Sequence, residues 1–239
     1  MGKVIIFPET VKNPITLIGH RAGICYESDV SDPEKNYKRG LDCIKSGHGR
    51  VLEFVDVHLG FKGYSAKVIR EWYTHIGGAP TRLQASTRYI EYGNFNYIIP
   101  KTIQDNPTAL GYYESCMNVI RETIKALETQ CNIPKEDSSM LCPLGMETMM
   151  VDKRNVRNLI DMSRNRECNR AFWEYRQLFS DVKNALAHWS KEWQELIDLT
   201  FHPKCVELRY CPEDKGCGRY PKKEDLYTIG VDLANERKQ

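Results

Sequence analysis

Short apolar runs and alternating segments predict where the strands lie. The run Lys3–Phe7 (KVIIF) precedes a proline and is typical of a short strand. Apolar and polar residues alternate along Val51–Phe61 (VLEFVDVHLGF), as in a strand with one buried face. Asn94–Ile99 (NFNYII) is rich in aromatic and β-branched residues and also precedes a proline. We expect strands at these positions, and either a further strand or the start of a helix at Ile15–Ile18.

Apolar residues spaced three and four apart predict the helices. One helix is expected to begin at Asp32–Glu34 and to end at Gly47, because proline favours a first turn and glycine favours an end. Ser65–Thr74 predicts a short helix, and Leu110–Leu127 predicts a longer amphipathic one. Asn155–Leu199 carries a continuous apolar stripe but is too long for one typical helix, so we expect two or three helices there.

Length, composition and charge restrict the class of protein. The chain has 239 residues, of which 41% are hydrophobic and 28% charged, and it fits one large soluble domain, alone or with an appendage. No apolar run approaches the ~20 residues of a membrane span, and the first residues lack the features of a secretory signal. Nine cysteines, mostly single among apolar residues, suit buried reduced thiols, so we expect a cytoplasmic protein. A net charge of +2 argues against a broad nucleic-acid surface but allows a small anionic ligand.

A candidate anion-binding segment runs from Glu71 to Tyr92. It contains a loop, Gly77–Pro80, with too much glycine and proline for a helix. Side chains suited to an anion follow shortly afterwards, namely Arg82, Ser86, Thr87, Arg88 and Tyr89. Arginine offers a rigid fork of donors that fits a phosphate or carboxylate, and hydroxyl groups add shorter hydrogen bonds. The segment favours a nucleotide or another phosphorylated small molecule; the alternative is a solvated surface loop in which the Ser86 hydroxyl stabilises a turn.

A second candidate segment, Lys153–Gln177, is rich in arginine. Its arginines are Arg154, Arg157, Arg164, Arg166, Arg170 and Arg176. Most such runs form a solvated helix face. Here asparagines stand between the arginines, and asparagine is unfavourable inside a helix unless it caps the helix or binds something. We therefore expect some of these side chains to face a ligand.

The tail after residue 200 differs in character, with several cysteines among turn residues. His202, Cys205, Cys211 and Cys217 are the candidate zinc ligands, because thiolates and imidazole are the groups that zinc prefers. The tail has no C-x2-C pair, however, and small buried thiols that pin the tail are the favoured alternative. We therefore expect no metal.

Several motifs follow one another in a recognisable order. They are Ser46-Gly47-His48 before a strand that ends at Phe61, the SxRY element Ser86-Thr87-Arg88-Tyr89, Pro143-Leu144 with Thr148, N-x-R-x-L at Asn155–Leu159, and Arg166 followed by Ala171-Phe172-Trp173-Glu174. Over most of its length, the chain resembles the flavin-dependent thymidylate synthases. No single motif is specific for this family, but the order and spacing of the motifs together are specific for it.

The resemblance implies an α/β (α+β) fold with a central, mostly antiparallel sheet flanked by helices. It implies a catalytic domain over residues 1–200 and a Cys-containing tail over 201–239. It also implies FAD as cofactor, dUMP as substrate, and methylenetetrahydrofolate and NADPH as co-substrates, in the reductive methylation of dUMP to dTMP. The active sites would be shared among the subunits of a homotetramer.

The resemblance also assigns roles to residues. The flavin-side positions are His48, Glu53, Asn155, Arg157 and Asp161, although the family usually has Asn where Asp161 stands. The nucleotide-side positions are Glu71, Gln84, Ser86, Thr87 and Arg88. By its position in the motif, Arg166 matches the catalytic arginine that activates the pyrimidine. The role is physically reasonable, because a guanidinium beside the ring nitrogen stabilises the ionised ring. Ser86 is not expected to act as a nucleophile, since no His or Asp lies at a recognisable spacing to activate it.

The chain departs from the family in one motif. Thr74-His75-Ile76 stands in place of an Arg-His-Arg triplet that meets flavin and nucleotide, so two cations are missing. Two extra residues follow, around Gly77–Pro80, and we expect Arg82 to replace a lost charge on the nucleotide side.

Three alternatives stay open. In the first, the chain is a related enzyme that acts on another uridine or deoxyuridine nucleotide or leaves a hydroxymethyl group on its product. In the second, the chain keeps the family fold but has lost turnover. In the third, it is a zinc-stabilised binding module with no enzymatic activity.

Overall fold

The computed structural model describes residues 2–227. The chain forms two compact units. Among the described residues, the sheet unit comprises residues 2–10 together with His58–Lys153, and the helical unit comprises Val11–Val57 together with residues 154–227. Among the described residues, no helix is both long and apolar enough to cross a membrane.

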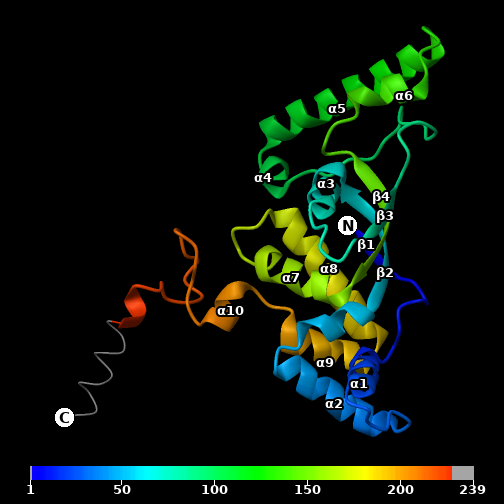
Figure 1. Ribbon diagram of the computed structural model, residues 1–239. Helices are drawn as coiled ribbons and strands as arrows, with labels where there is room; N and C mark the ends of the chain where they lie inside the picture. The colour runs from blue at the N-terminus through cyan, green and yellow to red at the C-terminus, as the bar shows by residue number, and fades with distance from the viewer. Residues whose placement is uncertain (1, 228–239) are drawn as a thin grey trace. The chain divides into compact units, whose positions relative to one another are not determined.

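The sheet unit is built on four described strands. They are β1 (Lys3–Ile6), β2 (Asp56–Ser65), β3 (Thr81–Gln84) and β4 (Glu147–Asn155), in the spatial order β1-β2-β4-β3 (Figure 1). β1 runs antiparallel to β2, with Ile5 opposite Gly60, and β3 runs antiparallel to β4, with Leu83 opposite Val151. The predicted fold class, an antiparallel sheet combined with helices, is confirmed.

Helix α3 (Ala66–Tyr73) covers part of the sheet unit's core. The Ser65 side chain caps it by accepting a hydrogen bond from the backbone N–H of Val68 at 3.1 Å. Val68, Ile69 and Trp72 are fully buried, and the Trp72 ring packs edge-on against Phe61 with ring centroids 4.9 Å apart. The loop that carries the candidate nucleotide-side residues therefore starts from a firmly packed helix.

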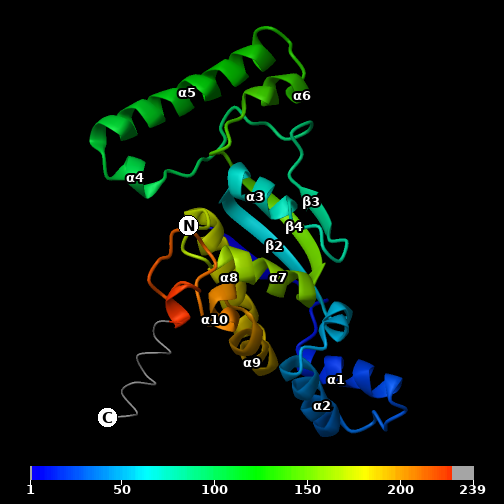
Figure 2. The same cartoon turned by 60° about the vertical axis from the view of Figure 1, so that its left-hand side comes forward.

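A long helix, α5 (Pro107–Thr129), makes a second small core in the same unit. The short helices α4 (Lys101–Gln104) and α6 (Lys135–Ser138) pack against it, and a 3-10 turn follows at Ser139–Leu141 (Figure 2). This core consists of Tyr92, Phe95, Met117, Ile124 and Met146. It anchors the loop between β3 and α4.

The helical unit is formed by helices from both ends of the chain. Its elements are α1 (Pro14–Cys25), α2 (Pro33–Lys45), the 3-10 helix η1 (Gly49–Phe54), α7 (Val156–Arg166), α8 (Trp173–Trp189), α9 (Lys191–Thr200) and α10 (Lys204–Leu208). Two glycines let α1 and α2 approach closely, because a Cβ at Gly19 would lie 1.7 Å from the carbonyl oxygen of Asn36, and one at Gly40 would lie 2.0 Å from that of Ile15. Any larger side chain would force the two helices apart.

The helix predictions agree with the structure, and two of the strand predictions need correction. Ile15–Ile18 lies in α1, and the predicted helices appear as α2, α3, α5 and α7–α9. The strand predicted at Val51–Phe61 begins only at Asp56, because the chain forms η1 over its first half, where Phe54 is exposed. Asn94–Ile99 is no strand; it makes one isolated bridge, from Tyr97 to Met146.

Two further outcomes concern the cysteines and the tail. The expectation of buried thiols is wrong: Cys25, Cys116, Cys131 and Cys217 are exposed and the other five cysteines are partly exposed, although all nine are free of disulfide bonds. The predicted division at residue 200 stays a prediction, and residues 228–239 of the predicted tail lie outside the described residues.

Candidate active site

The flavin-side residues lie in the helical unit, around the start of α7. Asn155 is buried and caps α7, since its side-chain oxygen accepts a hydrogen bond from the backbone N–H of Asn158 at 2.9 Å. Two residues further on, the Arg157 guanidinium pairs with the Glu53 carboxylate of η1 at 2.5 Å. One turn later, Asp161 pairs with Arg164 at 2.9 Å. The helix thus aligns Arg157, Asp161 and Arg164 along one side.

These side chains face a pocket within the helical unit. The pocket spans about 1000 Å³, including open solvent at its mouth. Its polar wall includes His48, Arg157, Asp161, Arg164, His202 and Glu207, and its apolar wall includes Ile44, Leu52, Ile160 and Leu199. The structure therefore gathers His48, Arg157 and Asp161 around one space and joins Glu53 to it through the ion pair with Arg157. Asn155, the cap of α7, is not part of the pocket wall. We call this pocket the α7 pocket.

The nucleotide-side residues lie in the sheet unit, along the chain that leaves α3. Glu71 lies in the last turn of α3, and Thr74 ends that helix. His75 and Ile76 follow in the loop, where Ile76 is exposed. Gly78 and Ala79 both have positive φ, so the loop turns sharply before β3.

Arg82 is already engaged within this loop. Its Nη1 donates a hydrogen bond to the Tyr73 carbonyl oxygen at 2.6 Å, and its guanidinium lies 4.4 Å from the centre of the Tyr73 ring. Burial raises the pKa of the Tyr73 hydroxyl. These contacts give Arg82 a structural role in holding β3 against the end of α3, and its predicted contact with a nucleotide stays a prediction.

The SxRY element forms a turn after β3. The Ser86 hydroxyl accepts a hydrogen bond from the backbone N–H of Arg88 at 3.1 Å. Arg88 pairs with Glu136 at 3.1 Å and lies over the Tyr89 ring, while Thr87 is exposed. Gln84 donates a hydrogen bond to Thr148 at 3.4 Å.

A pocket of the sheet unit lies beside this element. It spans about 600 Å³, including open solvent, and its wall includes Ala85, Tyr92, Phe95 and Thr148 rather than the predicted nucleotide-side residues. In contrast to the flavin-side set, the nucleotide-side set does not gather around this pocket.

The predicted catalytic arginine lies in the helical unit. Arg166 is the last residue of α7, and its guanidinium lies 4.5 Å from the centre of the buried Tyr175 ring of α8. Such a cation–π contact restricts the orientation of the guanidinium.

Sequence reasoning missed the burial of Arg154, which is 1% exposed and donates a hydrogen bond to the Asn158 side chain.

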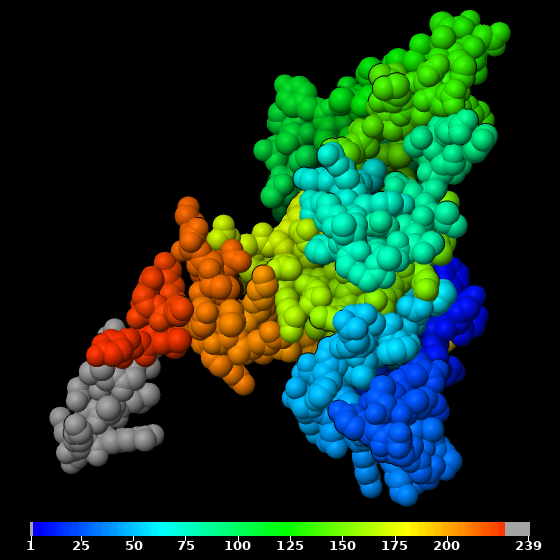
Figure 3. All heavy atoms as spheres, in the orientation of Figure 1, coloured from blue at the N-terminus to red at the C-terminus, as the bar shows by residue number. Residues whose placement is uncertain are grey.

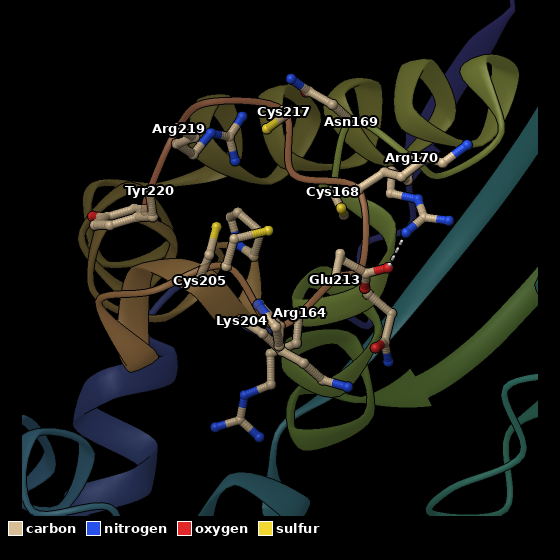
Figure 4. A pocket seen from close by; sticks show the side chains of 15 residues that line it. Arg164, Cys168, Asn169, Arg170, Lys204, Cys205, Glu213, Cys217, Arg219 and Tyr220 are labelled. Carbon is tan, nitrogen blue, oxygen red and sulfur yellow. Dashed lines mark hydrogen bonds and ion pairs between the residues drawn. The ribbon is translucent and has the colours of Figure 1, made fainter. Parts of the chain in front are cut away.

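A second pocket of the helical unit, the thiol pocket, lies between the end of α7, α10 and the segment after α10, and Arg164 lies in the wall of both pockets (Figure 4). Its wall includes Cys168, Cys205, Cys211 and Cys217. His202 lies in the wall of the α7 pocket instead. Within residues 2–227, no group of three or more His, Cys, Asp or Glu side chains is arranged to hold a metal ion, so the candidate zinc ligands are not assembled as a site.

Comparison with known proteins identifies the family. The family described as thymidylate synthase complementing protein (Thy1) matches residues 8–190. A flavin-dependent thymidylate synthase of Nitratidesulfovibrio vulgaris is 29% identical over 77% of this chain and 76% of its own length. One of Clostridium tetani is 27% identical over 95% of this chain and 98% of its own.

The fold also has a match among solved structures. The crystal structure of thymidylate synthase X from Helicobacter pylori with FAD and dUMP matches with a TM-score of 0.63, covering 82% of this chain and 99% of that chain at 18% identity. The sheet and helices described above are thus those of a thymidylate synthase X fold. The chain belongs to the Thy1 family, the flavin-dependent thymidylate synthases, so the predicted family and enzyme class are confirmed.

Proposed function

We propose that this protein converts dUMP to dTMP by flavin-dependent reductive methylation, with FAD as cofactor, methylenetetrahydrofolate as carbon donor and NADPH as reductant. The observation that supports this most is the α7 pocket, where His48, Arg157 and Asp161 face one space. The relatives named as flavin-dependent thymidylate synthases support the reaction, and the Helicobacter pylori enzyme with FAD and dUMP supports the ligands. The alternative of a non-enzymatic binding module is not favoured.

The α7 pocket suits the chemistry of FAD. FAD carries a diphosphate, sugar hydroxyls and flat apolar rings. The wall offers donors from His48 and Arg157, an acceptor from Asp161, and apolar contacts from Ile44 and Ile160. When bound, the reduced cofactor supplies the hydride that completes the methyl group.

The residues of the chain have distinct proposed roles. Asn155, by capping α7, and Glu53, by pairing with Arg157, orient the cofactor-binding side chains. Arg166 stabilises the ionised pyrimidine, since a fixed positive charge acts strongly on charge that develops beside it. The nucleotide-side set consists of Glu71, Thr74, Arg82, Gln84, Ser86, Thr87 and Arg88. Thr74, His75 and Ile76 are proposed to contact the flavin as well, because they replace the family triplet that meets both ligands.

We also propose a homotetramer with shared active sites. An apolar patch on the sheet supports a subunit contact: Ile5 is 40% exposed, Leu83 71%, Met149 49% and Val151 45%. These side chains surround one shallow depression of the sheet unit. Apolar area of this kind is normally covered by another protein surface. We call these four residues the sheet patch, and a second copy of the chain is its proposed occupant.

The proposal is tested by adding FAD to the purified protein and then supplying dUMP, methylenetetrahydrofolate and NADPH. We expect a bound-flavin absorption spectrum and the formation of dTMP. A hydroxymethylated product, or turnover only with another uridine nucleotide, would correct the reaction. Failure to bind FAD would overturn the proposal. A cytoplasmic location is part of the same proposal and is tested by cell fractionation.

A further inference from the structure

The α7 pocket includes residues that the family match does not reach. The match ends at residue 190, yet Leu199, Thr200, His202 and Glu207 form part of the pocket wall. Leu199 and Thr200 end α9, His202 lies in the link after it, and Glu207 lies in α10. In Figure 3, the orange segment lies beside a yellow-green surface of the helical unit, and the ion pair between Arg164 and Glu207 joins α7 to α10. The segment Leu199–Glu207 is called the C-terminal wall.

One arginine connects this wall to the predicted cofactor-binding helix. Arg164 Nη1 lies 2.9 Å from Asp161 Oδ1 on α7, and its Nε lies 3.0 Å from Glu207 Oε1 on α10. The same Glu207 oxygen lies 3.8 Å from His202 Nε2. A single guanidinium therefore bridges two carboxylates from segments 46 residues apart in the sequence.

This bridge has an electrostatic consequence for an anionic ligand. Asp161 and Glu207 place two negative charges in the pocket wall, and they would repel a diphosphate group. Arg164 offsets that charge and orients both carboxylates through its fixed planar fork. The ion pairs are partly exposed, so each contributes modestly on its own.

We propose that Arg164 is a positioning residue for the cofactor: it neutralises Asp161 and holds the C-terminal wall, through Glu207, as one side of the FAD pocket. The inference rests on the proposed function. It extends the cofactor site beyond the family match, to a segment and an arginine that no sequence motif assigned.

The chain contains a matched control. Arg170 pairs with Glu213 at 3.0 Å, a distance equal to that of Arg164 and Glu207, and the two pairs are similarly exposed. The Arg170–Glu213 pair borders the thiol pocket and not the α7 pocket (Figure 4). Arg170→Ala therefore removes an equivalent ion pair from the same part of the chain.

The first experiment measures FAD affinity by titration for the wild type and variants. We expect Arg164→Ala to weaken FAD binding about fivefold or more, and Arg170→Ala to stay within about twofold of the wild type. Asp161→Asn removes one of the two negative charges that Arg164 offsets, so adding it to Arg164→Ala should recover part of the lost affinity. An unchanged Arg164→Ala affinity, an equal loss in Arg170→Ala, or no recovery in the double variant would each overturn the inference.

The second experiment measures hydrogen exchange of the wild-type protein with and without FAD. Binding should slow exchange in the peptide that contains residues 199–207 more than in the peptide that contains residues 211–220. Equal exchange of the 199–207 peptide in both states would overturn the role of the C-terminal wall. If the wild type binds no FAD, the proposed function fails, and this inference fails with it; FAD binding without these effects overturns the inference alone.

Discussion

The α7 pocket and the SxRY turn organise their candidate site residues in different ways. In the helical unit, one helix and its cap align Arg157 and Asp161 toward a common space, because residues three and four apart share a helix face. In the sheet unit, the nucleotide-side residues follow one another along a loop, where Ser86 and Arg88 mainly bond to neighbouring groups. One helix thus supplies several aligned side chains to a pocket that other segments complete, whereas the loop residues do not gather around one pocket.

The largest effect is expected at Arg166, the proposed catalytic arginine of the helical unit. Arg166→Ala should lower the rate of dTMP formation about 10²- to 10³-fold, because it removes the charge that stabilises the ionised pyrimidine. FAD affinity should stay within about twofold, since Arg166 packs on Tyr175 and is not part of the α7 pocket wall. Rate measurements at saturating FAD check this, with Arg170→Ala as the control arginine. Near-normal turnover in Arg166→Ala would refute the role.

The next-largest effect is expected in the sheet patch, where charged variants test whether a second copy of the chain binds the sheet unit. Leu83→Glu with Val151→Glu places two charges side by side in the sheet patch, because the two residues are register partners. We expect a smaller oligomer by light scattering and the loss of most turnover. Val119→Glu on α5 is the control, since Val119 is 63% exposed in the same unit but lies outside the patch. An unchanged oligomer would exclude this face as the contact.

A pair of arginine variants separates the two regions directly. Arg157→Ala should weaken FAD binding about tenfold by removing a donor from the pocket wall. Arg88→Ala should instead raise the KM for dUMP several-fold and leave FAD affinity unchanged, because Arg88 lies in the SxRY turn. FAD titration and steady-state kinetics on both variants would reveal the separation. Equal effects on both ligands would mean that the two regions do not divide the ligands in this way.

The smallest effect concerns Arg82. Arg82→Ala loses the hydrogen bond and ring contact to Tyr73, and we expect about 1–2 kcal/mol of lost stability, measured by denaturant unfolding. The KM for dUMP should also rise if Arg82 replaces the charge missing from Thr74-His75-Ile76. A stability loss with normal nucleotide affinity would leave Arg82 a purely structural role.

The sequence predictions were accurate for elements defined by neighbouring residues and less accurate for elements defined by residues far apart in the chain. The helices α5, α7, α8 and α9 were predictable because their apolar spacing is a local property. The strands β3 and β4 were missed, since each is defined by its partner across the sheet. Near Val51, alternation suggested a strand, but η1 formed there instead.

The sequence by itself determined the family and the helices, because ordered motifs and a 3.6-residue period are written in neighbouring residues. It also indicated His48, Arg157 and Asp161 as one flavin-side set. Only the tertiary structure decided that they share a pocket with His202 and Glu207, and that Arg164 bridges Asp161 and Glu207. An ion pair between segments far apart in the chain leaves no periodic pattern, since it depends on how helices pack and not on the spacing of residues.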